Sequence, residues 1–278
     1  MLKARAILLA LGILVCGFGP AGAEEAAWET VQEILMGTKD IVVLDGIEKA
    51  PLRTEAGAMP DYGDWMVRFM LADPEKLNPV TASDAGASQV LENVFESLLN
   101  PEYDPPYKLR GWVAKDYPEI SDDRLTYTFE LRDGVHFSDG KPLTAEDVVF
   151  SMKVIHNPVV LAPHLRNYYA AVKDVQVEDG NKISFLCDQP YFRNDLILGG
   201  FNILPRHFYD PEGLMDPVEV ANLIDGSWEQ GPHKERIERF GEQFSQNFTR
   251  VALGSGPYLI ADPERDIVTQ QKVVLTRD

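Results

Sequence analysis

Apolar and polar residues alternate most clearly between positions 125 and 131. The apolar members are Leu125, Tyr127, Phe129 and Leu131, and the polar members between them are Thr126, Thr128 and Glu130. A period of two is typical of a half-buried strand, so a strand is predicted here. A hairpin is predicted from 172–177 to 182–186, because the turn residues Asp179, Gly180 and Asn181 separate these two runs.

Three segments show the spacing of three and four residues that predicts an amphipathic helix. One helix is expected to start after Ser83 or Asp84, either of which can cap it. Another is expected after Thr144, with Asp147 at the reciprocal position of a capping box. The third lies on a charged segment around position 240. The three apolar faces are Ala87, Val90, Leu91, Val94, Phe95 and Leu98; Val148, Val149, Met152 and Ile155; and Ile237, Phe240, Phe244 and Phe248.

Residues 1–23 have the pattern of a secretory signal peptide of bacterial type. Lys3 and Arg5 form a basic start, an apolar run follows, and Ala21-Gly22-Ala23 is a small-residue cleavage site. The apolar run is short for a membrane span. We therefore expect cleavage after Ala23 and a mature periplasmic chain that begins at Glu24.

Cys16 offers an alternative in which the chain is a lipoprotein, although Val15 occupies the position where lipidation requires a small residue. Cleavage after Ala23 removes Cys16 and leaves Cys187 as the only thiol, so no intramolecular disulfide is then possible. Cys187 follows a strand-like run, and we expect its side chain to be buried and unreactive.

The mature chain is expected to have two parts. Residues 24–63 form an N-terminal extension and linker, and residues 64–278 form the main domain. Within the first part, the pattern predicts a short amphipathic helix at 24–36, a brief strand at 40–44 and a linker rich in Gly, Ala and Pro at 54–63.

The charge of the chain excludes one class of partner. The 278 residues include 26 Lys and Arg against 44 Asp and Glu, which gives a net charge of −18. Loss of Lys3 and Arg5 with the signal peptide leaves 24 basic residues and a net charge of −20. Such a chain is repelled by nucleic acid and by anionic lipid, so no nucleic acid is expected to bind.

We expect no catalytic residue, metal site or cofactor. The sequence has no H-E-x-x-H, Walker A, G-x-G-x-x-G or paired-cysteine motif. The histidines have no ligand spacing; they are His136, His156, His164, His207 and His233. Ser255 lies in a Gly-Ser-Gly sequence, but Leu253 stands where a nucleophile elbow needs its first Gly. A secreted hydrolase that uses Ser255 stays open as an alternative.

Several segments resemble one known family. In residues 125–151, Asp133-Gly134 and Asp139-Gly140 predict tight turns between the strand and the capped helix. This block closely resembles the signature block of the family 5 extracellular solute-binding proteins, the oligopeptide- and dipeptide-binding receptors of bacterial ABC importers. Further similar segments are a first strand at 65–71, the Leu-Asn-Pro turn at 72–79, 94–99, part of 111–117, a strand end at 201–207, the Gly-Ser-Gly-Pro-Tyr turn at 254–258 and a strand at 266–277.

The resemblance implies an α/β fold of the periplasmic binding protein-like type (type II, the cluster with an extra subdomain). It implies capture of a peptide or similar small solute for ABC permease subunits in the inner membrane, with no reaction and no cofactor. In the family, the segment after the Leu-Asn-Pro turn lines the cleft from the first lobe. By resemblance, the ligand-binding residues are expected to be Thr81, Ala82, Ser83, Asp84 and Ala85. A helix N-terminus that only needs a cap is the alternative explanation of these residues.

Family members continue after the turn at 254–258 into a second lobe of comparable size, and nothing in this sequence matches that lobe. The chain is therefore expected to hold the first lobe plus the small subdomain, as a truncated gene or a fragment with the second lobe missing. Half a cleft should bind ligand weakly and should expose apolar surface that promotes association. A binding lobe with a chaperone or sensor role outside transport stays open as a further alternative.

Overall fold

The computed structural model of the chain describes residues 66–70, 72–102, 108–178 and 181–278. Met70–Asp278 belong to one structural unit, which is the part considered below. The signal peptide and the elements predicted within 24–63 lie outside the described residues.

The first strand predicted at 65–71 is wrong over its described residues. Residues 66–70 form neither strand nor helix, and Met66, Val67 and Phe69 are 78%, 57% and 84% exposed. An alternating sequence becomes a strand only where a neighbouring strand supplies hydrogen-bond partners, and none of the sheets in the described part of the chain includes residues 66–70.

The main sheet of the described residues has four antiparallel strands in the order β3 (Glu119–Ile120), β4 (Thr126–Glu130), β6 (Lys182–Cys187) and β5 (Val172–Val177). Tyr127 pairs with Phe185 and Phe129 with Ile183, and all four side chains are buried on one face. The strand predicted at 125–131 and the hairpin predicted at 172–186 are confirmed. Alternation is decisive here, because a slip of one residue would move all four side chains to the polar face.

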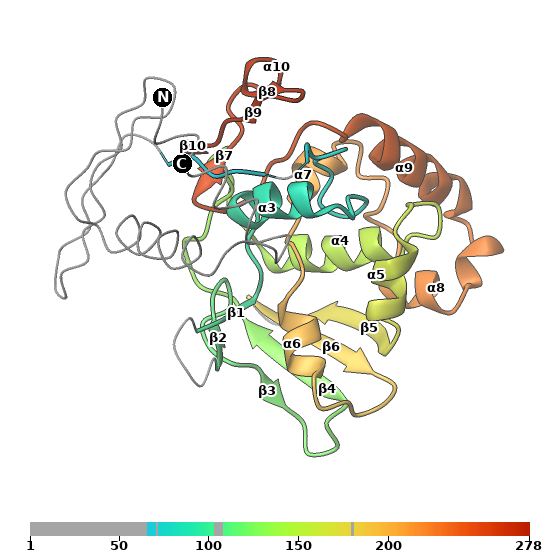
Figure 1. The fold of residues 1–278 in the computed structure, drawn as a ribbon. Coiled ribbons are helices and arrows are strands. Elements are labelled where there is room, and N and C mark those ends of the chain that lie inside the picture. The colour runs from blue at the N-terminus through green and yellow to red at the C-terminus, as the bar shows by residue number, and fades with distance from the viewer. Residues whose placement is uncertain (1–65, 71, 103–107, 179–180) are drawn as a thin grey trace, which may run out of the picture. The chain divides into compact units, whose positions relative to one another are not determined.

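Helix α4 (Ala145–His156) lies over the apolar face of the sheet (Figure 1). Ten of its twelve residues are buried, so it is covered on nearly every side rather than along one stripe. Helix α8 (Val220–Ile224) packs on β5 beside it, α5 (Pro163–Tyr168) packs on α4, and α6 (Asn194–Gly199) packs on the short strand β1 (Leu99–Pro101).

The turns before α4 form as predicted. Gly134 and Gly140 have φ of +76° and +81°, which an L-residue adopts only with strain. Thr144 caps the helix, and the carboxylate of Asp147 accepts the Thr144 backbone N–H at 2.9 Å and its hydroxyl at 2.9 Å. The capping box predicted from the sequence is therefore confirmed.

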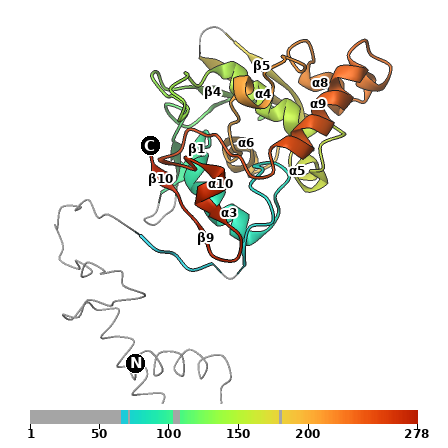
Figure 2. The same cartoon turned by 90° about the horizontal axis from the view of Figure 1, so that it is seen from above.

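A second group of helices packs against the other side of α4. These are α7 (Arg206–Tyr209) and α9 (Lys234–Asn247), and the rings of Phe150 on α4 and Phe240 on α9 lie 5.8 Å apart. Helix α3 (Ala85–Val94) packs on the short strand β7 (Tyr258–Leu259). The apolar face predicted for the third helix is confirmed, since Ile237, Phe240 and Phe244 are buried. Figure 2 shows α8 and α9 at the opposite end of the unit from the C-terminal strands.

Helix α3 ends earlier than its apolar pattern suggests. Phe95 and Leu98 are buried as predicted, but Phe95 is extended and the helix stops at Val94. The carbonyl oxygen of Val94 accepts the backbone N–H of Gly256 at 2.9 Å. A Cβ on Gly254 would overlap that same oxygen, so glycine is required for this close approach.

The C-terminal strand predicted at 266–277 is broken into shorter elements. Gln270 has a φ of +60° and reverses the chain between β8 and β9. The strand end predicted at 201–207 also does not pair with another strand. The backbone N–H of Ile203 bonds to the Glu96 carbonyl, and that of Leu204 bonds to the Ser151 hydroxyl.

The remaining elements are β2 (Leu109–Gly111), the 3-10 helix η1 (Ser227–Glu229), α10 (Pro263–Asp266), β8 (Ile267–Val268), β9 (Lys272–Val273) and β10 (Thr276–Arg277).

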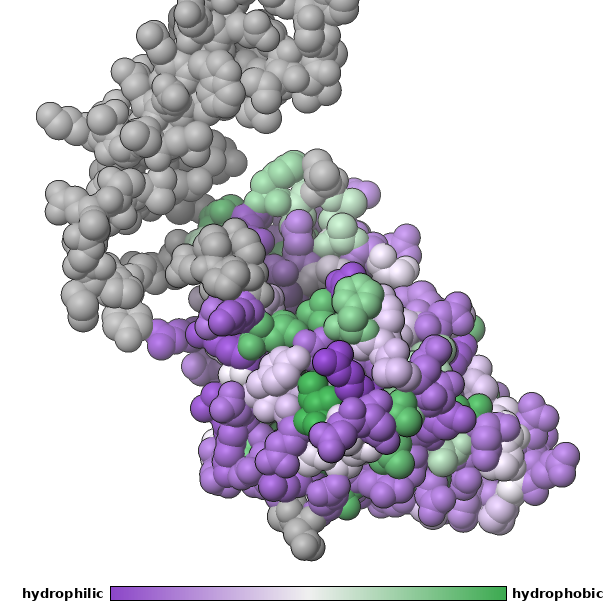
Figure 3. Space-filling view, turned by 90° about the horizontal axis from the view of Figure 1, so that it is seen from below, coloured by the Kyte–Doolittle hydropathy of each residue, from purple (hydrophilic) through white to green (hydrophobic). Residues whose placement is uncertain are grey.

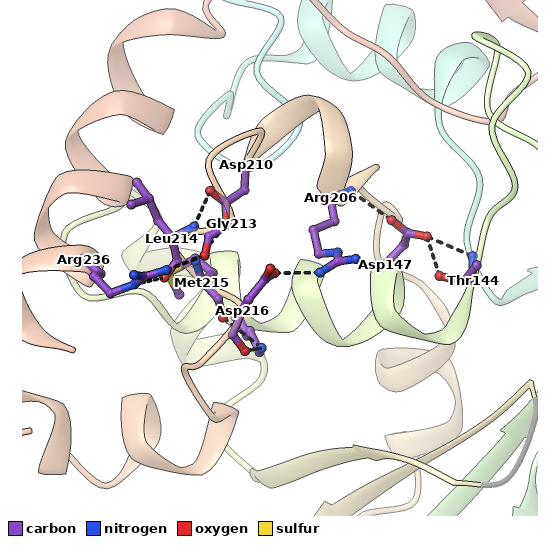
Figure 4. Close-up of polar contacts among 10 residues, drawn as sticks. Thr144, Asp147, Arg206, Asp210, Gly213, Leu214, Met215, Asp216 and Arg236 are labelled. Carbon is purple, nitrogen blue, oxygen red and sulfur yellow. Dashed lines mark hydrogen bonds and ion pairs between the residues drawn. The ribbon is translucent and has the colours of Figure 1, made fainter. Parts of the chain in front are cut away.

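A polar network fixes the loop after α7 to its surroundings (Figure 4). The carboxylate of Asp210 accepts the N–H groups of Leu214 and Met215 at 2.8 and 2.7 Å. Arg236 of α9 donates to the Leu214 carbonyl at 3.0 Å, and Lys153 of α4 donates to the Met215 carbonyl at 3.0 Å. Because the charged groups bind backbone partners of the same loop, we interpret this network as structural.

We predict that Gly254→Ala lowers the free energy of unfolding by about 3 kcal/mol, because the added methyl group pushes the 254–256 turn off α3. Gly134→Ala is the matched control, since a Cβ there meets open space and the cost is only the positive φ, about 1 kcal/mol. Chemical denaturation of both variants measures the difference. Equal losses would show that the close approach to Val94 is unimportant.

We predict that His156 makes the fold sensitive to acid. His156 is 6% exposed, and burial together with Arg166 lowers the pKa of its imidazole from 6.5 to about 4. The unfolded chain then binds the proton at higher pH than the folded chain. The free energy of unfolding is therefore not reduced by His156 above pH 6.5. It falls by roughly 3 kcal/mol as the pH drops from 6.5 to about 4.

Denaturation curves between pH 4 and pH 7 measure this loss. His156→Gln should flatten the dependence of stability on pH in that range, whereas the exposed-site control His164→Gln should leave it unchanged. The same slope in His156→Gln as in the unmodified chain would assign the acid sensitivity to other groups.

Candidate functional site

A buried asparagine organises the segment that the resemblance places in the ligand cleft. Asn78 is 0% exposed, and its Oδ1 accepts the backbone N–H groups of Val80 at 3.0 Å and Thr81 at 2.9 Å. Its Nδ2 donates to the carbonyl oxygen of Phe244 on α9 at 3.3 Å. The turn that leads into α3 is thereby anchored to a helix far away in the sequence. The sequence motif pointed to this turn, but it gave no role to Asn78.

The five predicted ligand-binding residues lie together, with different exposures. Thr81 is buried, Ala82 and Asp84 are half-buried, and Ser83 and Ala85 are exposed. Of the two candidate caps, the structure selects Asp84, whose Oδ1 accepts the Ala87 N–H at 2.7 Å. The alternative explanation of the segment as a capped helix start therefore holds for Asp84.

The backbone between the anchor and the helix is open. Ala82 donates its N–H to the Asn78 carbonyl at 3.0 Å, and Asp84 has an extended conformation, with φ −92° and ψ 153°. Within the described residues, no hydrogen bond involves Ser83, through either its backbone or its side chain. Free backbone N–H and C=O groups next to an extended residue are what a peptide needs in order to add as a strand.

A second segment supports this one closely. A Cβ on Gly86, in the first turn of α3, would lie 2.8 Å from the carbonyl oxygen of Ala72. The neighbouring Asp73 carboxylate accepts the backbone N–H of Gln270. Two contacts therefore hold the start of α3. Asn78 binds the turn that precedes the helix, and residues 72–74 lie against Gly86 in its first turn.

The geometry around Ser255 does not form a catalytic triad among the described residues. Ser255 lies in the turn that packs on the end of α3, near the half-buried carboxylate of Glu96. Burial raises the pKa of Glu96, against the opposing effects of the Ser255 hydroxyl and the Trp112 indole. His207 bonds instead to Asp139, at 2.7 Å.

Other reactive groups are also unsuited to catalysis. Cys187 is buried, and burial raises the pKa of its thiol to about 11, which disfavours the nucleophilic thiolate. In the ranges that the structure describes, no three His, Cys, Asp or Glu side chains come together as a metal site.

No helix in the described ranges is long and apolar enough to cross a membrane.

Two hollows of the described residues lie away from residues 81–85. One, of about 430 Å³, is bordered by Tyr117 and Phe192, and the other, of about 230 Å³, by Tyr169 and Cys187. The candidate ligand segment is therefore separate from both of these hollows.

Comparison with known proteins defines the class to which this fold belongs. Residues 108–278 match the family model for bacterial extracellular solute-binding proteins, family 5 Middle. The chain therefore belongs to the family 5 extracellular solute-binding proteins, and the expected family and fold class are confirmed.

Individual relatives support this assignment over part of their length. The probable peptide-binding protein YejA of Agrobacterium fabrum is 32% identical over 168 residues, which are 58% of this chain and 26% of YejA. The ABC transporter substrate-binding protein CtaP of Listeria monocytogenes has a TM-score of 0.54 and 27% identity, over 75% of this chain and 36% of CtaP. The oligopeptide-binding protein AppA of Bacillus subtilis, solved with a nonapeptide, has the same fold, with a TM-score of 0.54 and 21% identity, over 75% of this chain and 35% of AppA. The chain thus spans about a quarter to a third of these proteins.

We predict that Asn78→Ala lowers the free energy of unfolding by about 3 kcal/mol, because two buried N–H groups and one carbonyl lose their partner. Hydrogen exchange at Val80 and Thr81 should accelerate together with this loss. Ser83→Ala, four residues after the turn's proline, is the control and should change stability by less than about 0.5 kcal/mol, because its side chain is exposed. Unchanged exchange at Val80 in Asn78→Ala would refute the anchoring role.

Proposed function

We propose that this chain is part of a periplasmic receptor that captures peptides for an ABC importer, with residues 81–85 lining the ligand cleft. The observation that carries the proposal is the backbone of Ser83, which makes no hydrogen bond among the described residues. It lies between the turn that Asn78 anchors and the extended Asp84, in a member of a solute-binding family. The description of YejA as a probable peptide-binding protein and of CtaP as an ABC transporter protein supports the solute class and the transport role.

Backbone recognition suits a receptor for varied peptides. If the N–H and C=O of Ser83 pair with a peptide's main chain, the affinity does not depend on the peptide's side chains. The half-buried Ala82 and the exposed Ala85 are small and leave space for those side chains. Thr81 is buried, and its hydroxyl has no hydrogen-bond partner among the described residues. This hydroxyl can therefore bind a ligand that reaches the buried side of the segment.

The proposed receptor works in the periplasm and delivers its ligand to a permease. The signal peptide predicted at 1–23 directs the chain to the periplasm, and the permease subunits in the inner membrane are the expected recipients of the ligand. The strong negative charge of the chain disfavours nucleic acid as a competing partner.

We predict that Ser83→Pro weakens peptide binding by the full natural gene product at least tenfold, because proline has no N–H to donate. Ser83→Ala keeps the backbone donor and should bind within about twofold of the unmodified protein. Isothermal titration with trialanine, and with any peptide that co-purifies from the native periplasm, measures both.

Melting temperatures of the two variants control for damage to the fold. Equal affinities of Ser83→Pro and unmodified protein would show that the backbone of residue 83 does not bind peptide. The intact mass of the native protein, measured with its ligand retained, identifies the co-purified peptide and the length of the natural chain.

A further inference from the structure

A second concave surface lies on the sheet side of the unit, apart from residues 81–85. The groove of about 430 Å³ lies between β3, the turn from β3 to β4, and the start of α6. In Figure 1, β3 and α6 lie at the same end of the sheet. The volume is within the range of small-molecule sites. The lining residues that matter below are Tyr117, Asp122, Arg124, Tyr191, Phe192 and Asp195.

Three of these side chains are aromatic rings that face solvent. Phe192 is 79% exposed, and Tyr117 and Tyr191 are each 42% exposed. The rings of Tyr191 and Phe192 have centroids 4.8 Å apart and planes inclined at 63°, so they form a corner. Figure 3 shows the molecule from below, with apolar residues in several patches on a mostly hydrophilic surface. A cluster of exposed rings at a groove is typical of a binding surface.

The third ring is held in place by a polar contact. The Tyr117 hydroxyl donates to Asp195 Oδ2 at 2.5 Å, which joins the segment before β3 to helix α6. Burial and the Asp195 carboxylate raise the pKa of Tyr117 to about 12, so its hydroxyl stays neutral. The groove therefore has a fixed wall on this side rather than a free side chain.

Arg124 is placed at the groove by a strained backbone. Its φ is +58°, a left-handed conformation that glycine or asparagine adopts at lower cost. Within the described residues, the guanidinium group of Arg124 makes no hydrogen bond or ion pair, and neither does the carboxylate of Asp122. The groove thus offers one charged donor group and one charged acceptor group that are not used by the fold.

The mixture of charges restricts the ligand. An anion is repelled by the carboxylates of Asp122 and Asp195, and a cation that fills the groove must place part of its charge beside Arg124. A neutral ligand with many hydroxyl groups is opposed by none of them, because it can accept from the guanidinium and donate to the carboxylates. It also needs an apolar face to cover the exposed rings, as the C–H face of a pyranose ring does.

We propose that this groove is a saccharide-binding site, in which Phe192 and Tyr191 stack on a sugar ring and Asp122 and Arg124 bind its hydroxyl groups. The site is separate from the proposed peptide segment, so the two can be tested independently. A free oligosaccharide and a polymeric wall glycan share this chemistry.

The test is titration of the full chain with N-acetylglucosamine trimer and with maltotriose, followed by NMR or calorimetry. Binding of at least one of them, weakened tenfold or more by Phe192→Ala, is the expected result. Leu161→Ala is the matched control, because Leu161 is 70% exposed but lies outside the groove, and it should not change the affinity. Sedimentation with insoluble cell-wall glycan distinguishes the polymer from a free sugar as the source.

Two charge variants decide between the ligand classes. Arg124→Gly removes the donor and relieves the positive φ, so the protein should remain folded while saccharide affinity falls. Asp122→Asn should also weaken saccharide binding. If neither trimer binds, or if binding is unchanged in Phe192→Ala, the proposal is wrong. Tighter binding of arginine amide or of citrate than of either sugar by the unmodified protein would replace it with a site for an ion.

Discussion

The burial of α4 is the constraint on which the rest of the fold depends. A helix with ten of its twelve residues buried must have its polar groups satisfied by the elements that cover it. The carboxylate of Asp147 accepts the backbone N–H of Arg206 at 2.9 Å, and it also accepts the backbone N–H of Thr144, the cap residue of its own helix. Ser151 accepts the N–H of Leu204 at 2.8 Å. The chain after α6 is thus positioned by polar groups of α4, and α7 and α9 follow from that position.

The elements that the sequence predicts well are those specified by neighbouring residues. Strand β4 follows from alternation over seven positions, and the start of α4 follows from Thr144 and Asp147 three residues apart. The end of α3 does not follow from local pattern, because a glycine turn more than 150 residues later intercepts the carbonyl of Val94. The hairpin at Gln270 has no Asn-Gly or Asp-Gly signal, so its apolar flanks resembled one continuous strand.

The candidate sites divide in the same way, between features set by neighbouring residues and features set by tertiary contacts. The Leu-Asn-Pro motif located the segment 81–85, but the anchoring of Asn78 to Phe244 depends on a tertiary contact that spacing cannot reveal. The groove around Phe192 was not predicted, because its residues come from two stretches of sequence, 117–127 and 191–195, that lie more than 60 residues apart. Family membership then gives the fold and a class of solute-binding proteins. The segment around Ser83 rests on the resemblance together with its geometry, and the groove rests on geometry alone.

The bond from Asn78 to Phe244 joins residues 166 positions apart. Closing so long a loop has an entropic cost that only the finished packing offsets. Residues near position 78 can therefore take up their final structure only after α9 has been made and packed. The beginning of this unit and α9 thus complete their folding together.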